Sequence, residues 1–184
     1  MNDVTRDEIE VGDTMQRVLE VFPGARRALF RKYHLGGCSS CGFQPTETLG
    51  EVCARNGLDD VAGVLGHLRA SHEADEKILL SAVELARLRQ SERPPRLLDV
   101  RTREEWEAVR LEGAVLMNQE LMQEILGHWP REELMVVIDH DGRQGLDAAA
   151  YFLGHGFTQV RCLRGGLDAW SVEVDPRLPR YRLE

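Results

Sequence analysis

The chain has 184 residues, of which 42% are hydrophobic and 29% are charged. This length and hydrophobic content suffice for one ordinary domain core or two small ones. Its formal net charge is −8, and acidic residues outnumber basic ones in both parts of the chain. Nucleic acid and anionic membranes are therefore not expected as partners, because both require clustered Lys and Arg.

Neither a membrane span nor a secretion signal is expected. No apolar run approaches the roughly 20 residues that cross a bilayer, and the N-terminal residues are polar and acidic. Of the four cysteines, three lie between Cys38 and Cys53. This spacing favours a cytosolic thiol or metal site over an extracellular disulfide framework, so a cytoplasmic location is expected.

Four short helices are predicted in a small domain that covers residues 1–70. Apolar residues recur there at three- and four-residue spacing, as on one face of a helix. Asp13 or Thr14 can cap the first helix, and Thr46 can cap the third. The predicted ranges are 15–22, 23–33, 46–56 and 58–68.

Residues 71–77 (SHEADEK) are charged and show no apolar period, which indicates a linker. From 78 to 184, short apolar strands alternate with helical stretches, a pattern typical of a parallel sheet with helices on both faces. The predicted fold class is therefore α/β, preceded by a small all-α domain. Strands are predicted at 78–80, within 93–100, and at 113–117, 135–139 and 158–163; helices are predicted at 82–89, 104–110, 119–128, 145–154 and 167–170.

Several separated motifs in 78–184 resemble the rhodanese (sulfurtransferase) family. The matching residues are Asp99, Val100 and Arg101, then Glu104, Glu105 and Trp106, then Gly113 and Ala114, and finally Gly165, Gly166, Ala169 and Trp170. The resemblance implies a rhodanese-like sheet with its binding crevice at the carboxyl ends of the strands. For the motif residues themselves the expected role is structural, with Asp99 anchoring a turn and Trp170 in the core.

The family's active-site loop reads Cys-x-x-Gly-x-Arg-Ser, and its cysteine carries sulfur as a persulfide, stabilised by backbone N–H groups and a helix N-terminus. With Gly142 aligned to the family glycine, Asp139 takes the Cys position, Gln144 the Arg position and Gly145 the Ser position. A carboxylate cannot hold transferable sulfur, so the resemblance implies a fold without thiosulfate sulfurtransferase activity. The degenerate loop consists of Asp139, His140, Asp141, Gly142, Arg143, Gln144 and Gly145.

Asp139 can accept hydrogen bonds from the N–H groups of its own loop and thereby fill the anion site itself. Such bonds favour the ionised carboxylate. A divalent metal held by Asp139, His140 and Asp141 is a second possibility, although adjacent residues on one loop rarely converge on one ion. Cys162, on a predicted strand of the same domain, is expected to be a buried and inert thiol.

The other chemical cluster consists of Cys38, Cys41, Cys53 and His34. Cys38 and Cys41, flanked by glycines, can present both sulfurs to one point, and Cys53 and His34 could supply further ligands for zinc or an iron–sulfur cluster. The pair could instead be redox-active, or the thiols could be structural, with Cys53 in a helix core. The segment resembles small helical Cys-x-x-Cys domains of bacterial disulfide-reductase-associated and iron–sulfur-related proteins.

Three functions are compatible with these features. The leading hypothesis is a non-catalytic rhodanese-like protein that acts with a protein partner in sulfur or iron–sulfur handling. The first alternative is a sulfurtransferase or thiol-redox enzyme that uses Cys38 or Cys41. The second is a metal-free structural interaction module that forms a homo-oligomer.

Overall fold

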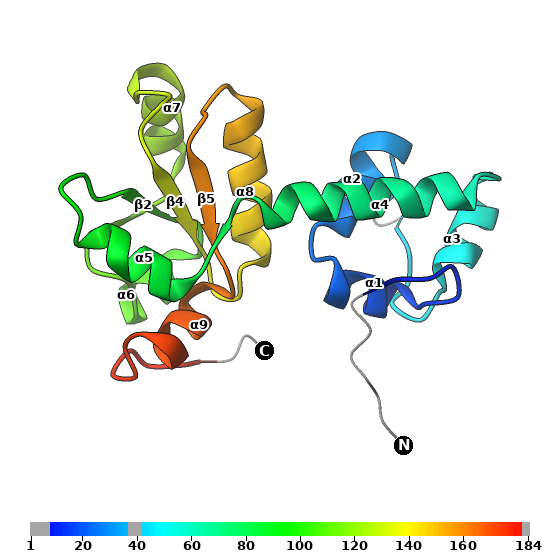
Figure 1. Cartoon of the computed structure of the whole chain (residues 1–184), viewed down its shortest axis with the longest axis horizontal. Coiled ribbons are helices and arrows are strands. Elements are labelled where there is room, and N and C mark those ends of the chain that lie inside the picture. The colour runs from blue at the N-terminus through cyan, green and yellow to red at the C-terminus, as the bar shows by residue number, and fades with distance from the viewer. Residues whose placement is uncertain (1–7, 37–41, 182–184) are drawn as a thin grey trace. The chain divides into compact units, whose positions relative to one another are not determined.

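The computed structural model describes residues 8–36 and 42–181. It divides the chain into two compact units, Met1–Glu76 and Lys77–Glu184 (Figure 1). Each unit is organised around its own apolar clusters, one in the first unit and two in the second.

The first unit is a small set of helices around one apolar cluster. Met15, Leu29, Leu49 and Leu68 come from four different helices, and each is at most 1% exposed. The prediction of four helices in this part of the chain is confirmed by the described residues. The helices are α1 (Met15–Val21), α2 (Ala25–Tyr33), α3 (Leu49–Arg55) and α4 (Val61–Glu76).

Two threonines begin helices in the first unit. Thr14, rather than Asp13, caps α1, and its hydroxyl oxygen accepts an N–H of the first turn at 3.3 Å. The prediction that Thr46 caps α3 was wrong. Thr48 takes that position, because Glu51 stands three residues later and completes a reciprocal capping box.

Within the segment predicted to be a linker, 71–77, residues 71–76 instead form the last turns of α4. Its side chains are held by the first unit: His72 stacks on Phe22 with ring centroids 4.2 Å apart, and the buried Asp75 forms an ion pair with Arg27. These contacts stabilise the last turns of the helix in the absence of a periodic apolar face. The boundary between the two units therefore falls at the end of α4 rather than before it.

The second unit contains a five-stranded sheet in the order β1-β5-β4-β2-β3, and every neighbouring pair is parallel. This confirms the predicted α/β class with preceding helices. The strands are β1 (Leu79–Leu80), β2 (Arg96–Asp99), β3 (Ala114–Leu116), β4 (Met135–Ile138) and β5 (Val160–Leu163); the helices are α5 (Ala82–Arg89), α6 (Arg103–Ala108), α7 (Gln119–His128), α8 (Arg143–Gly154) and α9 (Gly166–Glu173).

Helices cover both faces of this sheet (Figure 1). In the central strand β4, Val136 and Ile138 pack with residues of α5 and α9, whereas Met135 and Val137 pack with residues of α7 and α8. All four side chains are at most 2% exposed, which explains why β4 is a continuous apolar run. Within residues 8–36 and 42–181, no helix combines the length and apolarity needed to cross a bilayer.

Candidate functional site

The candidate site lies where β4 ends and α8 begins. Asp139 directly follows β4, and Gly142, with a φ of 88°, turns the chain into α8. A side chain at position 142 would meet the backbone of Gly165 at 2.8 Å, so only glycine fits this turn. Because β2 and β5 pair with β4 in parallel, the carboxyl ends of these strands meet at the same edge of the sheet, where ligands bind in such folds.

Asp139 fills this loop with its own carboxylate. Its Oδ1 accepts the N–H of Gly142 at 2.7 Å, its Oδ2 accepts the N–H of Gly145 at 3.0 Å, and the residue is 2% exposed. Both donors lie at the start of α8, where the helix dipole also favours an acceptor. The prediction that Asp139 accepts the N–H groups of its own loop is therefore confirmed.

Two opposing influences act on the pKa of Asp139. Burial raises the pKa of Asp139 above its ordinary value, and the neighbouring carboxylate of Asp141 raises it further. The hydrogen bonds from Gly145 and Gly142 lower the pKa, but they do not compensate for the lost hydration. The hydrogen bonds thus favour the ionised form as expected, whereas burial of the carboxyl group, which the expectation left out, opposes them and sets the net upward direction of the pKa.

Gly145 and Cys162 explain why the loop has no room for the family's serine. A Cβ atom at position 145 would lie 2.9 Å from the Sγ of Cys162 and 3.2 Å from the Oδ1 of Asp139. Cys162 lies on β5 and is 0% exposed, and its thiol donates to the carbonyl of Gly142 across 3.7 Å. The prediction of a buried Cys162 is confirmed, and its sulfur takes the space that a side chain at position 145 would need.

A pocket of about 170 Å³ opens beside this loop. Asp139 lies at its buried end, and Asp141, Arg143 and Gln144 are exposed. The side chain of Arg143 lies 3.5 Å from a carboxylate oxygen of Asp141, so the two charges largely offset each other at the mouth. The lining residues are Arg101, Glu105, Asp139, His140, Asp141, Arg143 and Gln144.

Arg101 forms a rigid wall of the pocket. Its guanidinium donates from Nε and Nη2 to the two oxygens of Asp99, at 3.0 and 2.7 Å, and both residues are at most 6% exposed. Asp99 also accepts the backbone N–H of Arg101 at 3.1 Å, which confirms its predicted role as a turn anchor. Trp170, at 4% exposure, is in the core as predicted.

Tyr181 is a residue of this site that sequence reasoning missed. Its hydroxyl accepts from Nη1 of Arg101 at 2.8 Å and donates to Oε1 of Glu105 at 2.7 Å. Its ring lies against His140, with centroids 4.3 Å apart. No local pattern around position 181 indicates this contact, because it depends on how the chain after α9 returns to the loop.

No group of three or more potential metal ligands is present in residues 8–36 and 42–181. In the loop, Asp139 already accepts two N–H groups, and Oδ1 of Asp141 accepts the backbone N–H of Arg143 at 3.1 Å. The side chains of Asp139, His140 and Asp141 thus line one pocket without converging on a common point for an ion.

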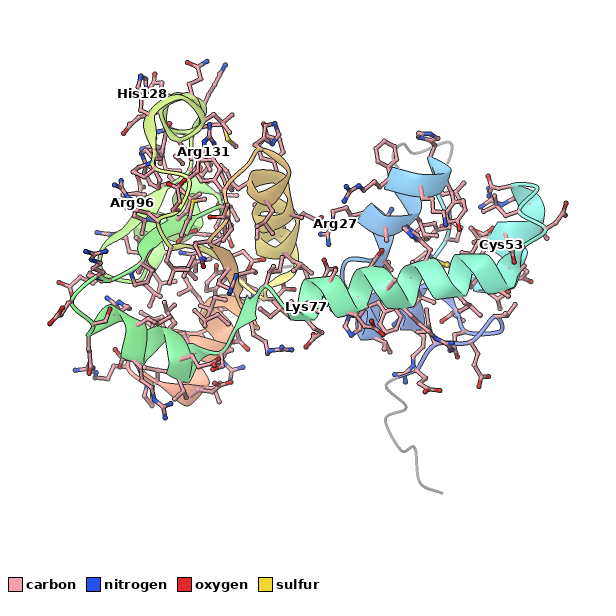
Figure 2. The ribbon with its side chains drawn as sticks, turned by 45° about the horizontal axis from the view of Figure 1, so that its top comes forward. Arg27, Cys53, Lys77, Arg96, His128 and Arg131 are labelled. Atoms are coloured by element: carbon pink, nitrogen blue, oxygen red, sulfur yellow. The ribbon has the colours of Figure 1, made fainter. Side chains whose placement is uncertain are left out.

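Of the four candidate ligands in the first unit, Cys38 and Cys41 lie outside the described residues. Cys53, labelled in Figure 2, is 0% exposed and belongs to the apolar cluster of the unit. Burial raises the pKa of the Cys53 thiol, which disfavours the thiolate that a metal would need. His34 caps α2 with a φ of 57°, and its ring meets the edge of Phe30.

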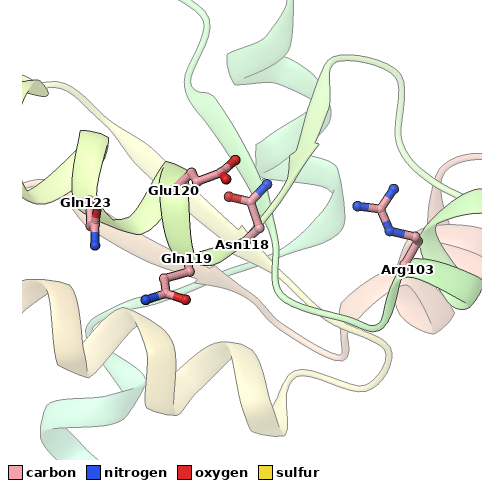
Figure 3. A pocket seen from close by; sticks show the side chains of 5 residues that line it. All are labelled: Arg103, Asn118, Gln119, Glu120 and Gln123. Atoms are coloured by element: carbon pink, nitrogen blue, oxygen red, sulfur yellow. The ribbon is translucent and has the colours of Figure 1, made fainter.

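A second, larger pocket of about 460 Å³ lies between the start of α7 and the start of α6 (Figure 3). Its lining is polar and includes three side-chain amides. Asn118 also caps α7, its Oδ1 accepting the N–H of Leu121 at 2.8 Å. The lining residues are Arg103, Asn118, Gln119, Glu120 and Gln123.

Comparison with known proteins places the second unit in one family. The model of the rhodanese-like domain matches residues 81–173. Adenylyltransferase and sulfurtransferase UBA4 of Candida albicans is 26% identical over 153 residues, which are 78% of this chain and 34% of the relative. The probable adenylyltransferase/sulfurtransferase MoeZ of Mycobacterium tuberculosis is 31% identical over 87 residues, which are 46% of this chain and 22% of the relative.

Among solved structures, the crystal structure of reduced Bacillus anthracis CoADR-RHD shares the fold. It is 18% identical with a TM-score of 0.50, and the match covers 65% of this chain and 21% of that chain. This chain therefore spans well under half the length of each of these relatives. The family match over 81–173, together with the five-stranded parallel sheet, shows that the chain belongs to the rhodanese-like domain family.

Proposed function

We propose that this protein is a non-catalytic rhodanese-like protein that binds a partner in sulfur or iron–sulfur handling. The observation that carries this proposal is the carboxylate of Asp139, which accepts the N–H groups of Gly142 and Gly145 in the loop. The family resemblance puts a persulfide in this place. These two N–H groups are engaged by the side chain of Asp139 and are therefore not available to a transferred sulfur.

The chemistry of sulfur transfer supports the same reading. The transfer needs a thiolate that attacks the donor's sulfur–sulfur bond and keeps the terminal sulfur as a persulfide. A carboxylate oxygen cannot form that stable intermediate. Cys162 is the one cysteine in the sequence of the second unit, and at 0% exposure it has no access to a sulfur donor in solution.

The names of the relatives suggest the kind of partner. UBA4 and MoeZ are adenylyltransferase and sulfurtransferase proteins, and this chain matches 34% and 22% of their lengths. We infer that the present protein meets a partner that carries or accepts sulfur, and that it contributes a binding surface rather than the sulfur-carrying residue. The pocket lined by Arg101, Glu105 and the loop is the proposed contact.

Release of thiocyanate from thiosulfate and cyanide tests this proposal. The wild-type protein, Cys38→Ser, Cys41→Ser and Asp139→Cys are assayed together, with mass spectrometry after exposure to thiosulfate. Wild-type protein is expected to give no turnover and no sulfur adduct on residues 77–184. Asp139→Cys is expected to gain one sulfur atom at position 139, because the N–H donors of the loop then surround a thiolate.

Each other outcome separates the alternatives. Wild-type turnover that disappears in Cys38→Ser or Cys41→Ser would replace the binding module with an enzyme that uses the N-terminal thiols. Wild-type turnover that survives both changes, with a sulfur adduct on Cys162, would show that the buried thiol reaches the donor. Either result would overturn the non-catalytic proposal.

For the first unit, we propose that Cys38 and Cys41 carry any metal or redox chemistry and that Cys53 is a core residue. Support comes from the burial of Cys53 among apolar side chains and from its raised pKa. Zinc and iron analysis of anaerobically purified protein, with thiol titration, should show that Cys53→Ala keeps any bound metal, whereas Cys38→Ser loses it. Loss of metal in Cys53→Ala, with an unchanged fold, would make Cys53 a ligand instead.

A further inference from the structure

The chain after α9, residues 174–181, returns to the second unit at three separate points. Leu178 packs against the apolar cluster beneath α5 and α9. Arg180 donates from Nε and Nη2 to the two carboxylate oxygens of Asp168, at 2.6 and 2.8 Å. Tyr181 then reaches the pocket at the loop. These side-chain contacts add to the backbone bonds that the N–H groups of Val174 and Asp175 donate to the carbonyl of Trp170.

Tyr181 contacts three of the residues that line the pocket. Its hydroxyl accepts a hydrogen bond from Nη1 of Arg101 and donates one to Oε1 of Glu105, while its ring lies against that of His140. Burial and the bond to Glu105 raise the pKa of Tyr181 to about 12. The hydroxyl therefore stays protonated at neutral pH and can serve both neighbours at once.

One ring nitrogen of His140, Nδ1, is buried in this arrangement and lacks a hydrogen-bond partner among the described residues. A buried polar atom without a partner costs free energy that contact with water removes. The closed arrangement thus combines two hydrogen bonds at Tyr181 with an opposing cost at His140, a cost that contact with water would remove.

We propose that residues 174–181 form a strap beside the Asp139 pocket, with Tyr181 as its latch, so that a ligand in the pocket reaches Nη1 of Arg101 by displacing Tyr181. This inference rests on the proposed function, since a strap controls binding only if the pocket receives a partner. Arg101 remains tied to Asp99 when the latch opens, with Nη1 directed at the vacated position. The displacing group must therefore present an oxygen that accepts from Arg101 and a hydrogen that it donates to Glu105, and a hydroxyl meets both conditions.

Labelling of histidines with diethyl pyrocarbonate, read for each peptide by mass spectrometry, tests the latch without any ligand. Tyr181→Ala removes the ring and both hydrogen bonds, and we expect the labelling rate of His140 to rise about tenfold in this variant. Tyr181→Phe keeps the ring over His140 but loses both hydrogen bonds, so a smaller rise of about threefold is expected. His128, which is exposed, serves as the internal reference in every sample, and His155, also exposed, is a second reference in the Tyr181 variants.

Tyr151→Ala is the matched control. Tyr151 lies against His155 with ring centroids 4.1 Å apart, a pair of the same kind on α8, away from the strap. This change should alter the labelling of His155 and leave that of His140 at the wild-type rate. Thermal unfolding of each variant shows whether the fold is kept.

Two results would overturn the strap. One is a wild-type labelling rate for His140 in both Tyr181 variants. The other is an equal rise for His140, His128 and His155, which would mean general loosening rather than local opening. Neither result bears on the thiocyanate assay, so failure of the strap and failure of the non-catalytic proposal are distinguished.

Discussion

A carboxylate and a persulfide place different demands on the same ring of backbone N–H groups. The carboxylate of Asp139 has two oxygens, and each meets one N–H, from Gly142 and from Gly145. Because the residue is also 2% exposed, the loss of hydration outweighs these bonds and the pKa rises. At the scale of one residue, the loop holds a structural carboxyl group where the family resemblance expects a reactive thiol. The free energy of burying this group depends on whether it is protonated.

The stability of the protein should depend on pH through Asp139. Its folded pKa lies above its unfolded pKa, so the folded state binds the proton more tightly. The free energy of unfolding should therefore fall as the pH rises from about 4, the ordinary value for aspartate, through the raised folded value. Asp139→Asn removes this titration. Urea denaturation over that range should show wild-type protein losing stability relative to Asp139→Asn, and a constant difference would contradict the raised pKa.

Gly145 and Cys162 should be energetically coupled. Gly145→Ala places a Cβ 2.9 Å from the Sγ of Cys162 and should lower the free energy of unfolding by about 1–3 kcal/mol. In a Cys162→Ala background the same change should cost about 1 kcal/mol less, because the opposing sulfur is gone. Gly154→Ala, in the same helix and with open space around it, is the control that should not destabilise. Additive effects in the double-mutant cycle would rule out the close contact.

At the scale of an element, α4 shows how tertiary contacts extend a helix beyond its sequence pattern. Residues 71–76 carry charged and small side chains without a continuous apolar stripe. They are helical because Asp75 pairs with Arg27 and His72 stacks on Phe22, and both partners belong to the first unit. Because helix formation is cooperative, the residues between His72 and Asp75 then continue the backbone hydrogen bonding of the helix.

A proline in this segment distinguishes a helix from a linker. Ala74 is exposed in the last turns of α4, so Ala74→Pro removes a helical hydrogen bond without disturbing a core side chain. The change should lower the free energy of unfolding of the first unit by about 3 kcal/mol. Ala74→Gly, measured by the same chemical denaturation, should cost about 1 kcal/mol. A linker would tolerate both changes equally, and such a result would argue against the helix.

At the scale of the whole molecule, each apolar cluster has its buried members within a single unit of the chain. The buried members of the first cluster all precede Ser71, and those of the other two all follow Lys77. The sheet of the second unit takes its apolar cover from α5, α7, α8 and α9, which belong to the same unit. A unit with its own core satisfies the main condition for folding by itself.

Residues 77–184 should therefore fold without the first unit. We expect this fragment to show a cooperative thermal transition and dispersed amide resonances. Leu85, Val137 and Phe152, each 0% exposed, should keep their protection in hydrogen exchange. An unfolded fragment would mean that the first unit supplies stabilisation that the sheet requires.

The sequence was informative wherever local pattern decides structure. Alternating apolar strands and helices predicted the α/β class, and the motifs around Asp99, Gly142 and Trp170 located the loop correctly. The sequence was less informative about helix ends: Thr46 and Thr48 are both good caps, and only the capping box with Glu51 separates them.

What the sequence alone determined is the chemical identity at the loop: an aspartate stands where the family resemblance requires a thiol. What only the tertiary structure decided is the environment of that aspartate. Its raised pKa, the closeness of Cys162 to position 145 and the reach of Tyr181 over His140 all depend on packing between residues far apart in the chain. Periodicity and local motifs record which way a side chain faces, whereas hydration and contact distance are set by everything that folds around it.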